Sequence, residues 1–189
     1  NSIDAFPGST SVFAGIICRY GDSTKVTNIS GNTISNIRLQ DVNTLGTHNF
    51  IEVGAFLLTN GGTVNIANNL VRNFNDAGRS GITGISCAYV AGWGGYSYIN
   101  LSGNVIESIS RPNTSATDNF RFFTGMECSF PATFYGNRIG SFTNPNDMIL
   151  GTRGINYGFR AAMGGINCFN NDTIANINFT NTNVANVFY

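Results

Sequence analysis

Few side chains in this sequence of 189 residues could carry out acid, base or metal chemistry, and they are widely spread. His48, in the segment Gly-Thr-His-Asn-Phe, is the only histidine, and it could act as a general base. We expect it instead to lie in a solvent-exposed loop. The aspartates are scattered through loop-like segments, so the sequence offers no acidic cluster for calcium.

The balance of charges argues against several classes of partner. Ten acidic and ten basic residues give a net charge of zero, and charged residues make up only 11% of the chain, against roughly 25% in ordinary soluble domains. Neutrality gives no electrostatic support for binding nucleic acid. No apolar run reaches the roughly 18 residues of a membrane-spanning helix, so membrane insertion is not expected. The abundance of Asn, Gly, Thr, Phe and Ile favours short strands joined by tight turns.

A corner motif that recurs along the chain indicates how these strands are organised. The segment "GNTISNI" at 31–37 returns in related form at 68–74, 103–109 and 136–142, and a fifth copy at 170–177 carries one extra residue. One such unit cannot bury its own apolar face, but stacked copies can, so the period of about 35 residues predicts a solenoid. An antiparallel β-sandwich also has many short strands, but it gives no reason for a fixed period.

Stacking would bring like residues of successive corners into register about 4.8 Å apart. The leading asparagines would then form a ladder, because asparagine tolerates a left-handed corner conformation and can hydrogen-bond to the neighbouring turn. The predicted ladder residues are Asn32, Asn69, Asn104, Asn137 and Asn171. A second column with the same role is predicted for Asn36, Asn73, Ser108, Ser141 and Asn176. The apolar residues expected to face inward just before these turns are Ile29, Ile66, Leu101, Phe134 and Cys168.

A second motif, a glycine followed by alternating apolar residues, recurs between the corners. Its copies begin at Gly15, Gly54, Gly84, Gly125 and Gly154. The first, third and fifth positions after the glycine are mostly apolar and are expected to face inward, which leaves the second and fourth positions facing outward.

The outward positions hold only two ionisable residues, Arg19 and Glu127, which lie three coils or about 14 Å apart. No two carboxylates there reach the roughly 5 to 9.5 Å separation used in glycoside hydrolysis, so no catalytic residue is assigned. Four other outward residues would form a contiguous apolar patch on the first three coils. We expect this patch to be an assembly interface or to be covered by a loop of the same chain, and its residues are Ile17, Phe56, Leu58 and Ala88.

The four cysteines, Cys18, Cys87, Cys128 and Cys168, are interpreted as small apolar core residues. With no Cys-x-x-Cys pair and a single histidine, a zinc site is not expected, and neither a metal nor another cofactor is assigned. Cys87 and Cys128 would lie on adjacent coils, so a disulfide between these two is the alternative.

The Asn-x-Ile-x-Asn-Ile corners, the apolar columns and the coil length resemble those of the pectin-lyase-like superfamily over residues 12–187. The resemblance implies an all-β fold, a single right-handed parallel β-helix of about five coils in one domain that covers residues 1–189. The coils are expected near residues 12–40, 50–75, 81–110, 121–143 and 151–178, with a partial coil at 179–189. Because this superfamily hosts lyases, hydrolases, tailspikes, adhesins and passive structural segments, the resemblance indicates architecture more than function.

A glycine-rich insertion at 91–98 contains the only tryptophan. Trp93, Tyr96 and Tyr98 could stack on sugar rings and so contact a glycan, since aromatic faces are good platforms for the apolar faces of carbohydrates. The alternative is that these aromatic rings pack back on the coil.

The expected function is structural or adhesive, as an extracellular, cell-surface or virion-surface solenoid of the non-catalytic kind. It would act by self-assembly or by contact with neighbouring subunits, because the Asn/apolar pattern continues to residue 189 without a charged stop and would present open strand edges. The alternative is a polysaccharide-binding or polysaccharide-degrading module, such as part of a lyase, hydrolase or tailspike, whose partner would be a surface glycan. For that alternative the residues to test are Glu127, Arg19 and Trp93.

Overall fold

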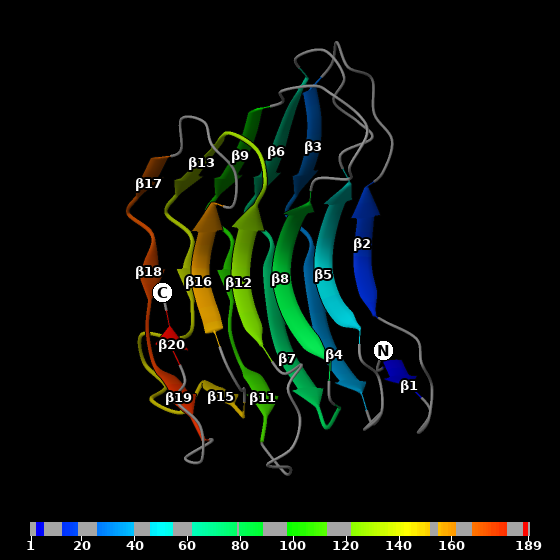
Figure 1. Ribbon diagram of the computed structural model, residues 1–189, viewed down its shortest axis with the longest axis vertical. Helices are drawn as coiled ribbons and strands as arrows, with labels where there is room; N and C mark the ends of the chain where they lie inside the picture. Colours follow the sequence, from blue (N-terminus) through cyan, green and yellow to red (C-terminus); the bar gives the residue numbers. More distant parts are fainter. Residues whose placement is uncertain are drawn as a thin grey trace.

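The chain forms a stack of short β-strands (Figure 1). The computed structural model describes residues 3–5, 13–18, 26–39, 46–54, 62–78, 80–88, 98–112, 122–151, 155–161, 168–180 and 187–188. Every strand pair within these segments is parallel, and each strand pairs with its equivalents one repeat away. Across the same segments, no helix is long and apolar enough to cross a membrane.

The strands belong to three sheets. The six-stranded sheet has, in order, β2 (Ala14–Cys18), β5 (Thr47–Gly54), β8 (Gly81–Ala88), β12 (Phe123–Cys128), β16 (Ile155–Ala161) and β20 (Val187–Phe188). The five-stranded sheet has β3 (Val26–Ser30), β6 (Thr63–Ala67), β9 (Tyr98–Ser102), β13 (Ala132–Tyr135) and β17 (Cys168–Asn170). The nine-stranded sheet has β1 (Ile3–Ala5), β4 (Thr33–Leu39), β7 (Leu70–Asp76), β10 (Val105–Ile106), β11 (Ile109–Arg111), β14 (Arg138–Ile139), β15 (Met148–Leu150), β18 (Thr173–Ile174) and β19 (Ile177–Phe179).

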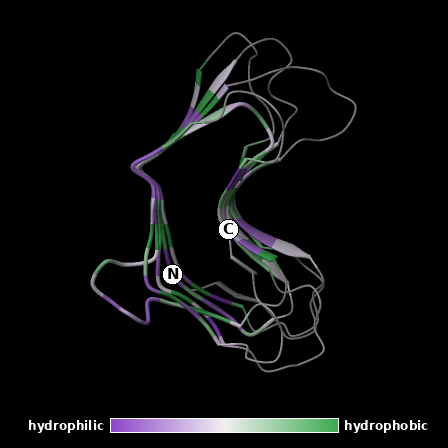
Figure 2. Ribbon diagram, turned by 60° about the vertical axis from the view of Figure 1, so that its left-hand side comes forward, coloured by the Kyte–Doolittle hydropathy of each residue, from purple (hydrophilic) through white to green (hydrophobic). Residues whose placement is uncertain are grey.

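Figure 2 looks more nearly along the stack, so that equivalent strands of successive coils lie behind one another. The predicted fold class, an all-β parallel solenoid with a period of about 35 residues, is confirmed, for example by the pairing of Asn65 with Asn100. The antiparallel sandwich is wrong, because the described strand pairs are parallel. The predicted count of about five coils differs slightly from the structure, in which the six-stranded sheet has one strand more than the five-stranded sheet.

The inward column before the asparagine corner is confirmed in four of its five members. Ile29, Ile66, Leu101 and Phe134 lie in register and are buried. The fifth member is Phe169, which stacks on Phe134 with ring centroids 4.6 Å apart, and not Cys168, which pairs with Thr133 and is exposed. The reason is that the fifth repeat contains no extra residue: residues 171–177 align directly with 31–37.

The asparagine ladder runs through one corner of the coil. The backbone N–H and the Nδ2 of Asn32 both donate to Oδ1 of Asn69, and Asn69 and Asn104 repeat these two bonds to the next rung. The last rung is Asp172 and not the predicted Asn171, because Asn137 donates to Oδ1 of Asp172 at 2.8 Å. The left-handed conformation belongs to the residue before each rung and not to the rung itself, as φ shows for Gly31, Asn68, Gly103, Gly136 and Asn171.

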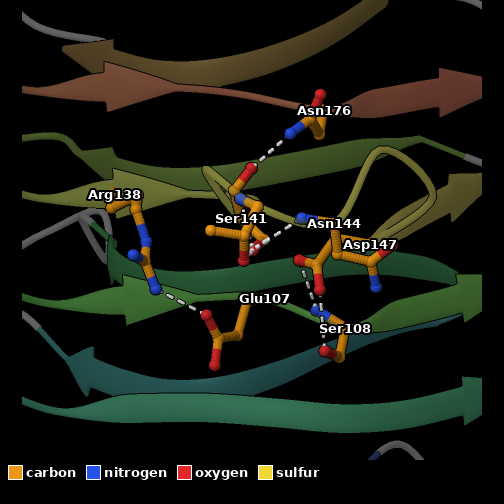
Figure 3. Close-up of polar contacts among 8 residues, drawn as sticks. Glu107, Ser108, Arg138, Ser141, Asn144, Asp147 and Asn176 are labelled. Atoms are coloured by element: carbon orange, nitrogen blue, oxygen red, sulfur yellow. Dashed lines mark hydrogen bonds and ion pairs between the residues drawn. The ribbon is translucent and has the colours of Figure 1, made fainter.

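The second polar column is confirmed at Asn36, Asn73, Ser108 and Asn176, all of which have positive φ. Its fourth member is Asp147 and not Ser141, because an insertion after Gly140 carries Ser141 out of the column (Figure 3). The Ser108 N–H and hydroxyl donate to the Asp147 carboxylate at 2.8 and 2.9 Å. Asn176 Nδ2 donates instead to the carbonyl oxygen of Ser141, at 2.6 Å.

Glycines in the six-stranded sheet allow the opposite wall to approach closely. A Cβ at Gly84 or Gly125 would overlap the Cδ1 atoms of Ile106 and Ile139, which point across the interior. In the second coil Phe50 takes the place of the glycine, and the residue in register with those isoleucines is the smaller Val71. Close packing across the interior is therefore maintained by different residues in different coils.

One ion pair lies inside the apolar stack. Asp76 and Arg111 are in register on β7 and β11, their side chains are 0% exposed, and Arg111 Nε lies 3.4 Å from Asp76 Oδ2. Asp76 Oδ1 accepts from the Gly78 N–H at 2.7 Å, and Arg111 Nη2 donates to the carbonyl oxygens of Gly78 and Ser80. Removal of either partner would leave a buried charge without its counter-ion.

Candidate ligand-binding groove

The residues on the outer face of the six-stranded sheet differ from those predicted. Ala14 pairs with Asn49 and Ile16 with Ile51, so Gly15 lies opposite Phe50 and not opposite Gly54. In the fifth coil the same position is occupied by Gly158 and not by Gly154. Two of the five glycine motifs were therefore placed four residues out of register.

The corrected register places a row of polar and charged side chains on the outer face. Ile17 is followed along the stack by Glu52, Ser86, Glu127 and Arg160. The prediction that Glu127 faces outward is confirmed, and the prediction that Arg19 is its only ionisable companion is wrong, because Glu52 and Arg160 share the row. Arg19 itself lies outside the described residues.

A second outward row runs beside the first. It holds one residue from each of β5, β8, β12 and β16, namely Asn49, Thr83, Thr124 and Tyr157. Thr83, Ser86 and Thr124 point outward but are only 2%, 5% and 3% exposed, which places them at the floor of a groove between taller side chains. The groove has a volume of about 550 Å³ and is lined by Thr47, Asn49, Thr83, Ser86, Phe122, Thr124, Glu127, Ile155, Tyr157 and Arg160.

Hydrogen bonds and ion pairs fix the charged groups of the groove. Glu127 Oε2 lies 3.1 Å from Arg160 Nη1, and Glu127 Oε1 accepts from the Ser86 hydroxyl at 3.4 Å. The Arg160 guanidinium also lies over the ring of Tyr157, 4.8 Å from its centroid. On the other side, Asn49 Nδ2 donates to Glu52 Oε2 at 3.0 Å. These side chains are held in place before any ligand binds.

The chemistry available in the groove suits binding of hydroxyl groups. Carboxylate oxygens of Glu127 accept hydrogen bonds, the Arg160 guanidinium donates them, and the threonine and serine hydroxyls do both. Glu52 and Glu127 lie two strands apart, about 9.6 Å at the usual strand spacing. Glu127 already accepts hydrogen bonds from the Ser86 hydroxyl and the Arg160 guanidinium, so these contacts fix its orientation in the groove.

His48 lies inside the stack and not in the exposed loop that was predicted. It is on β5, in register with the buried Ile82, and it is only 3% exposed. Its Nδ1 accepts from the Phe13 N–H at 2.9 Å. Asn156 is the second residue after Gly154, a position that was expected to face outward, but it is also fully buried. Its Oδ1 accepts from the Phe123 N–H at 2.9 Å. Both side chains satisfy backbone donors, so neither contributes to the groove.

The four cysteines are free, and three of them share an inward column as predicted. Cys87 and Cys128 are buried neighbours on β8 and β12 that are not joined by a disulfide. The hydrogen bond with Cys128, followed by burial, raises the pKa of Cys87 well above its usual value. Burial also raises the pKa of Cys18. In the described part of the chain, no three His, Cys, Asp or Glu side chains are grouped so as to hold a metal ion.

Only some of the predicted interface and glycan-contact residues lie in the part of the chain that the structure describes. Ile17 is 50% exposed on β2, but its neighbour along the row is Glu52 and not an apolar residue. The backbone of Ala88 pairs with that of Gly54. Tyr98 lies exposed on β9, on a different sheet from the groove. The remaining four residues, Phe56, Leu58, Trp93 and Tyr96, lie outside the described residues.

Sequence reasoning missed Glu52, Tyr157 and Arg160, although a signal for them exists. The motif glycines are unevenly spaced, because Gly54 comes 39 residues after Gly15 and Gly154 comes 29 residues after Gly125, whereas the corners repeat every 33 to 37 residues. Applying the corner spacing to the strands would have selected Phe50 and Gly158 instead.

In comparisons with protein-family models, curated proteins and solved structures, nothing matched the chain.

Proposed function

We propose that this protein binds a polysaccharide chain in the groove on the outer face of β5, β8, β12 and β16. The observation that carries the proposal is the pair of polar rows that run along the stack, with Ser86 and Thr124 at the floor and Glu127 and Arg160 joined beside them. Each row repeats at the strand spacing of about 4.8 Å, which is close to the length of one pyranose unit. A glycan that lies along the stack would therefore meet one polar side chain of each row at each successive sugar.

The preorganisation of the groove supports a binding role. Arg160 is held by both Glu127 and the Tyr157 ring, so little side-chain freedom is lost when a ligand binds. Two half-buried aromatic side chains that line the groove, Phe122 and Tyr157, can contact the apolar faces of sugar rings. Hydroxyls and carboxylates on the same surface can pair with sugar hydroxyls.

The remaining expectations about the biology are part of the same proposal. An extracellular, cell-surface or virion-surface location would bring the groove into contact with surface glycans. Membership of the pectin-lyase-like superfamily, as a member that binds without cleaving, is likewise proposed on the basis of the parallel stack and its asparagine ladder.

A second candidate function, self-association, is favoured by the last described coil. Phe169 and Ile174, on β17 and β18, are 49% and 40% exposed. Strands β17, β18 and β19 are at the ends of their sheets in the described chain. Exposed apolar residues beside open strand edges are features of assembly surfaces. Light scattering after gel filtration tests this candidate: a defined oligomer would support it, and a monomer at high concentration would contradict it.

The experiment that tests glycan binding compares soluble polysaccharides by affinity electrophoresis and titration calorimetry. We expect wild-type protein to bind at least one neutral glucan, mannan, xylan or galactan. Thr124→Val keeps the shape of the side chain but removes one hydroxyl, and should weaken binding about fivefold, since a hydrogen bond contributes about 1 kcal/mol net. Glu127→Gln, which removes the charge paired with Arg160, should weaken binding more strongly.

The matched control is Thr33→Val, the same change at an exposed position of β4 on another sheet. It should leave binding unchanged, and circular dichroism should show that all three variants are folded. The proposal would be contradicted if no polysaccharide bound, or if Thr124→Val and Glu127→Gln bound as tightly as the wild type.

A further inference from the structure

The outer face of the five-stranded sheet carries no charged residue along its described strands. Strands β3, β6, β9, β13 and β17 contain no Asp, Glu, Lys or Arg at any position. The outward side chains form three rows across the sheet, set by the register of the strands. The rows consist of Val26, Thr63 and Tyr98; Asn28, Asn65, Asn100, Thr133 and Cys168; and Ser30, Ala67, Ser102, Tyr135 and Asn170.

The middle row is fixed by hydrogen bonds between its own side chains. Asn65 Nδ2 donates to Asn28 Oδ1 at 2.9 Å, and Asn100 Nδ2 donates to Asn65 Oδ1 at 2.8 Å. Each amide keeps a second N–H and further acceptor capacity, because one amide offers two donors and two lone pairs. The row therefore presents evenly spaced polar groups in a fixed orientation toward solvent.

Two tyrosines rise from the same face on either side of the amide row. Tyr98 and Tyr135 are 43% and 51% exposed, on the adjacent strands β9 and β13. Tyr135 is in register with Ser102, four residues after Tyr98, so the two side chains begin about 13 Å apart along the strand direction. The hydroxyl of Tyr98 shares a hydrogen bond with the hydroxyl of Thr133, which ties the Tyr98 ring to the face.

We propose that this face is a second binding surface, which adsorbs to the ordered surface of an insoluble neutral polysaccharide. A sheet face without charged side chains has no desolvation penalty for buried charges when it meets an uncharged surface. Its fixed amides can pair with rows of sugar hydroxyls, and its two exposed aromatic rings supply apolar contact at little cost in conformational entropy. The surface is distinct from the groove, which lies on the six-stranded sheet.

The test is a depletion assay with microcrystalline cellulose and with crystalline chitin. Wild-type protein should be depleted from solution by at least one of them, and the double variant Tyr98→Ala/Tyr135→Ala should bind at least tenfold more weakly. Tyr98→Phe keeps the ring and loses only the bond to Thr133, so it should retain most of the binding. Phe142→Ala removes an exposed aromatic ring outside this face and should bind like the wild type.

The outcomes separate this surface from the groove and from self-association. The groove variant Thr124→Val should leave adsorption unchanged, so loss of adsorption in that variant would overturn the proposal of a separate surface. Absence of adsorption to both solids would overturn it as well. It would also be overturned if light scattering showed a wild-type oligomer that Tyr98→Ala/Tyr135→Ala converts to monomer, because the face would then bind a second copy of the chain.

Discussion

Replacement of Asn104 by alanine should destabilise the protein far more than the same replacement at Asn32, the first rung of the ladder. The Asn104 side chain is fully buried, and its Oδ1 accepts from the backbone N–H and the Nδ2 of Asn69 at 3.1 and 3.0 Å. Its Nδ2 donates to the Ile66 carbonyl oxygen at 2.7 Å and to Asn137 Oδ1 at 2.9 Å. Alanine removes all four bonds and leaves buried partners without them.

The expected loss follows from the number of bonds. With about 0.5–1.5 kcal/mol for each hydrogen bond, Asn104→Ala should lower the free energy of unfolding by about 4 kcal/mol. The Asn32 side chain donates only to Asn69 Oδ1 and to the Ser30 carbonyl oxygen, in a more exposed setting. Asn32→Ala should therefore cost only about 1 kcal/mol.

Urea unfolding followed by circular dichroism and by fluorescence of Trp93 measures both free energies, provided that the two probes report one transition. Asn32→Ala is the matched control, because it makes the same chemical change at the equivalent corner position. Equal losses in the two variants would refute the reasoning, since they would show that the additional bonds and the burial of Asn104 add nothing beyond the contribution of the exposed rung.

Three further predictions concern the interior. Arg111→Leu should lower the free energy of unfolding in urea by about 3–5 kcal/mol, because it leaves Asp76 buried without its counter-ion. The double variant with Asp76→Leu should recover most of that loss, and no recovery would contradict the pairing. Gly125→Ala should lower the thermal midpoint and cost about 1–3 kcal/mol, because its Cβ would overlap both a carbonyl oxygen and a side chain; an unchanged midpoint would contradict the close packing. In the native state, a thiol reagent should modify the exposed Cys168 before the buried Cys87, as peptide mass mapping would show, and equal rates would contradict the burial.

The corners could be predicted from sequence because their conformation is set locally. Each corner has a residue with positive φ, then a ladder residue, and then an apolar residue two positions after the ladder residue, and these features repeat in the printed sequence. Two of the errors arose where a residue of a different type from the predicted one occupies a corner position. Asp172 accepts the same bonds as an asparagine rung, and Asp147 takes the place of Ser141 because an insertion with its own turn displaces the serine.

The groove could not be placed from the glycine motif because the glycine is required by packing across the interior. Gly84 is needed where Ile106 approaches, but in the second coil the facing residue is Val71 and the position is filled by Phe50. The size of the residue at the glycine position thus depends on a facing side chain that lies far from it in the sequence. Once the register is shifted by four residues, Glu52 takes the place in the outer row that the sequence had assigned to Phe56.

The central claim, that the groove of the six-stranded sheet holds a glycan, is tested most directly by an NMR titration. Isotope-labelled protein would be titrated with a soluble oligosaccharide derived from the polysaccharide that binds best. The account predicts that the largest changes in amide chemical shift fall on β8, β12 and β16, at and around Thr83, Ser86 and Thr124. Saturable shifts confined to the five-stranded or nine-stranded sheet, or no shifts at all, would contradict it.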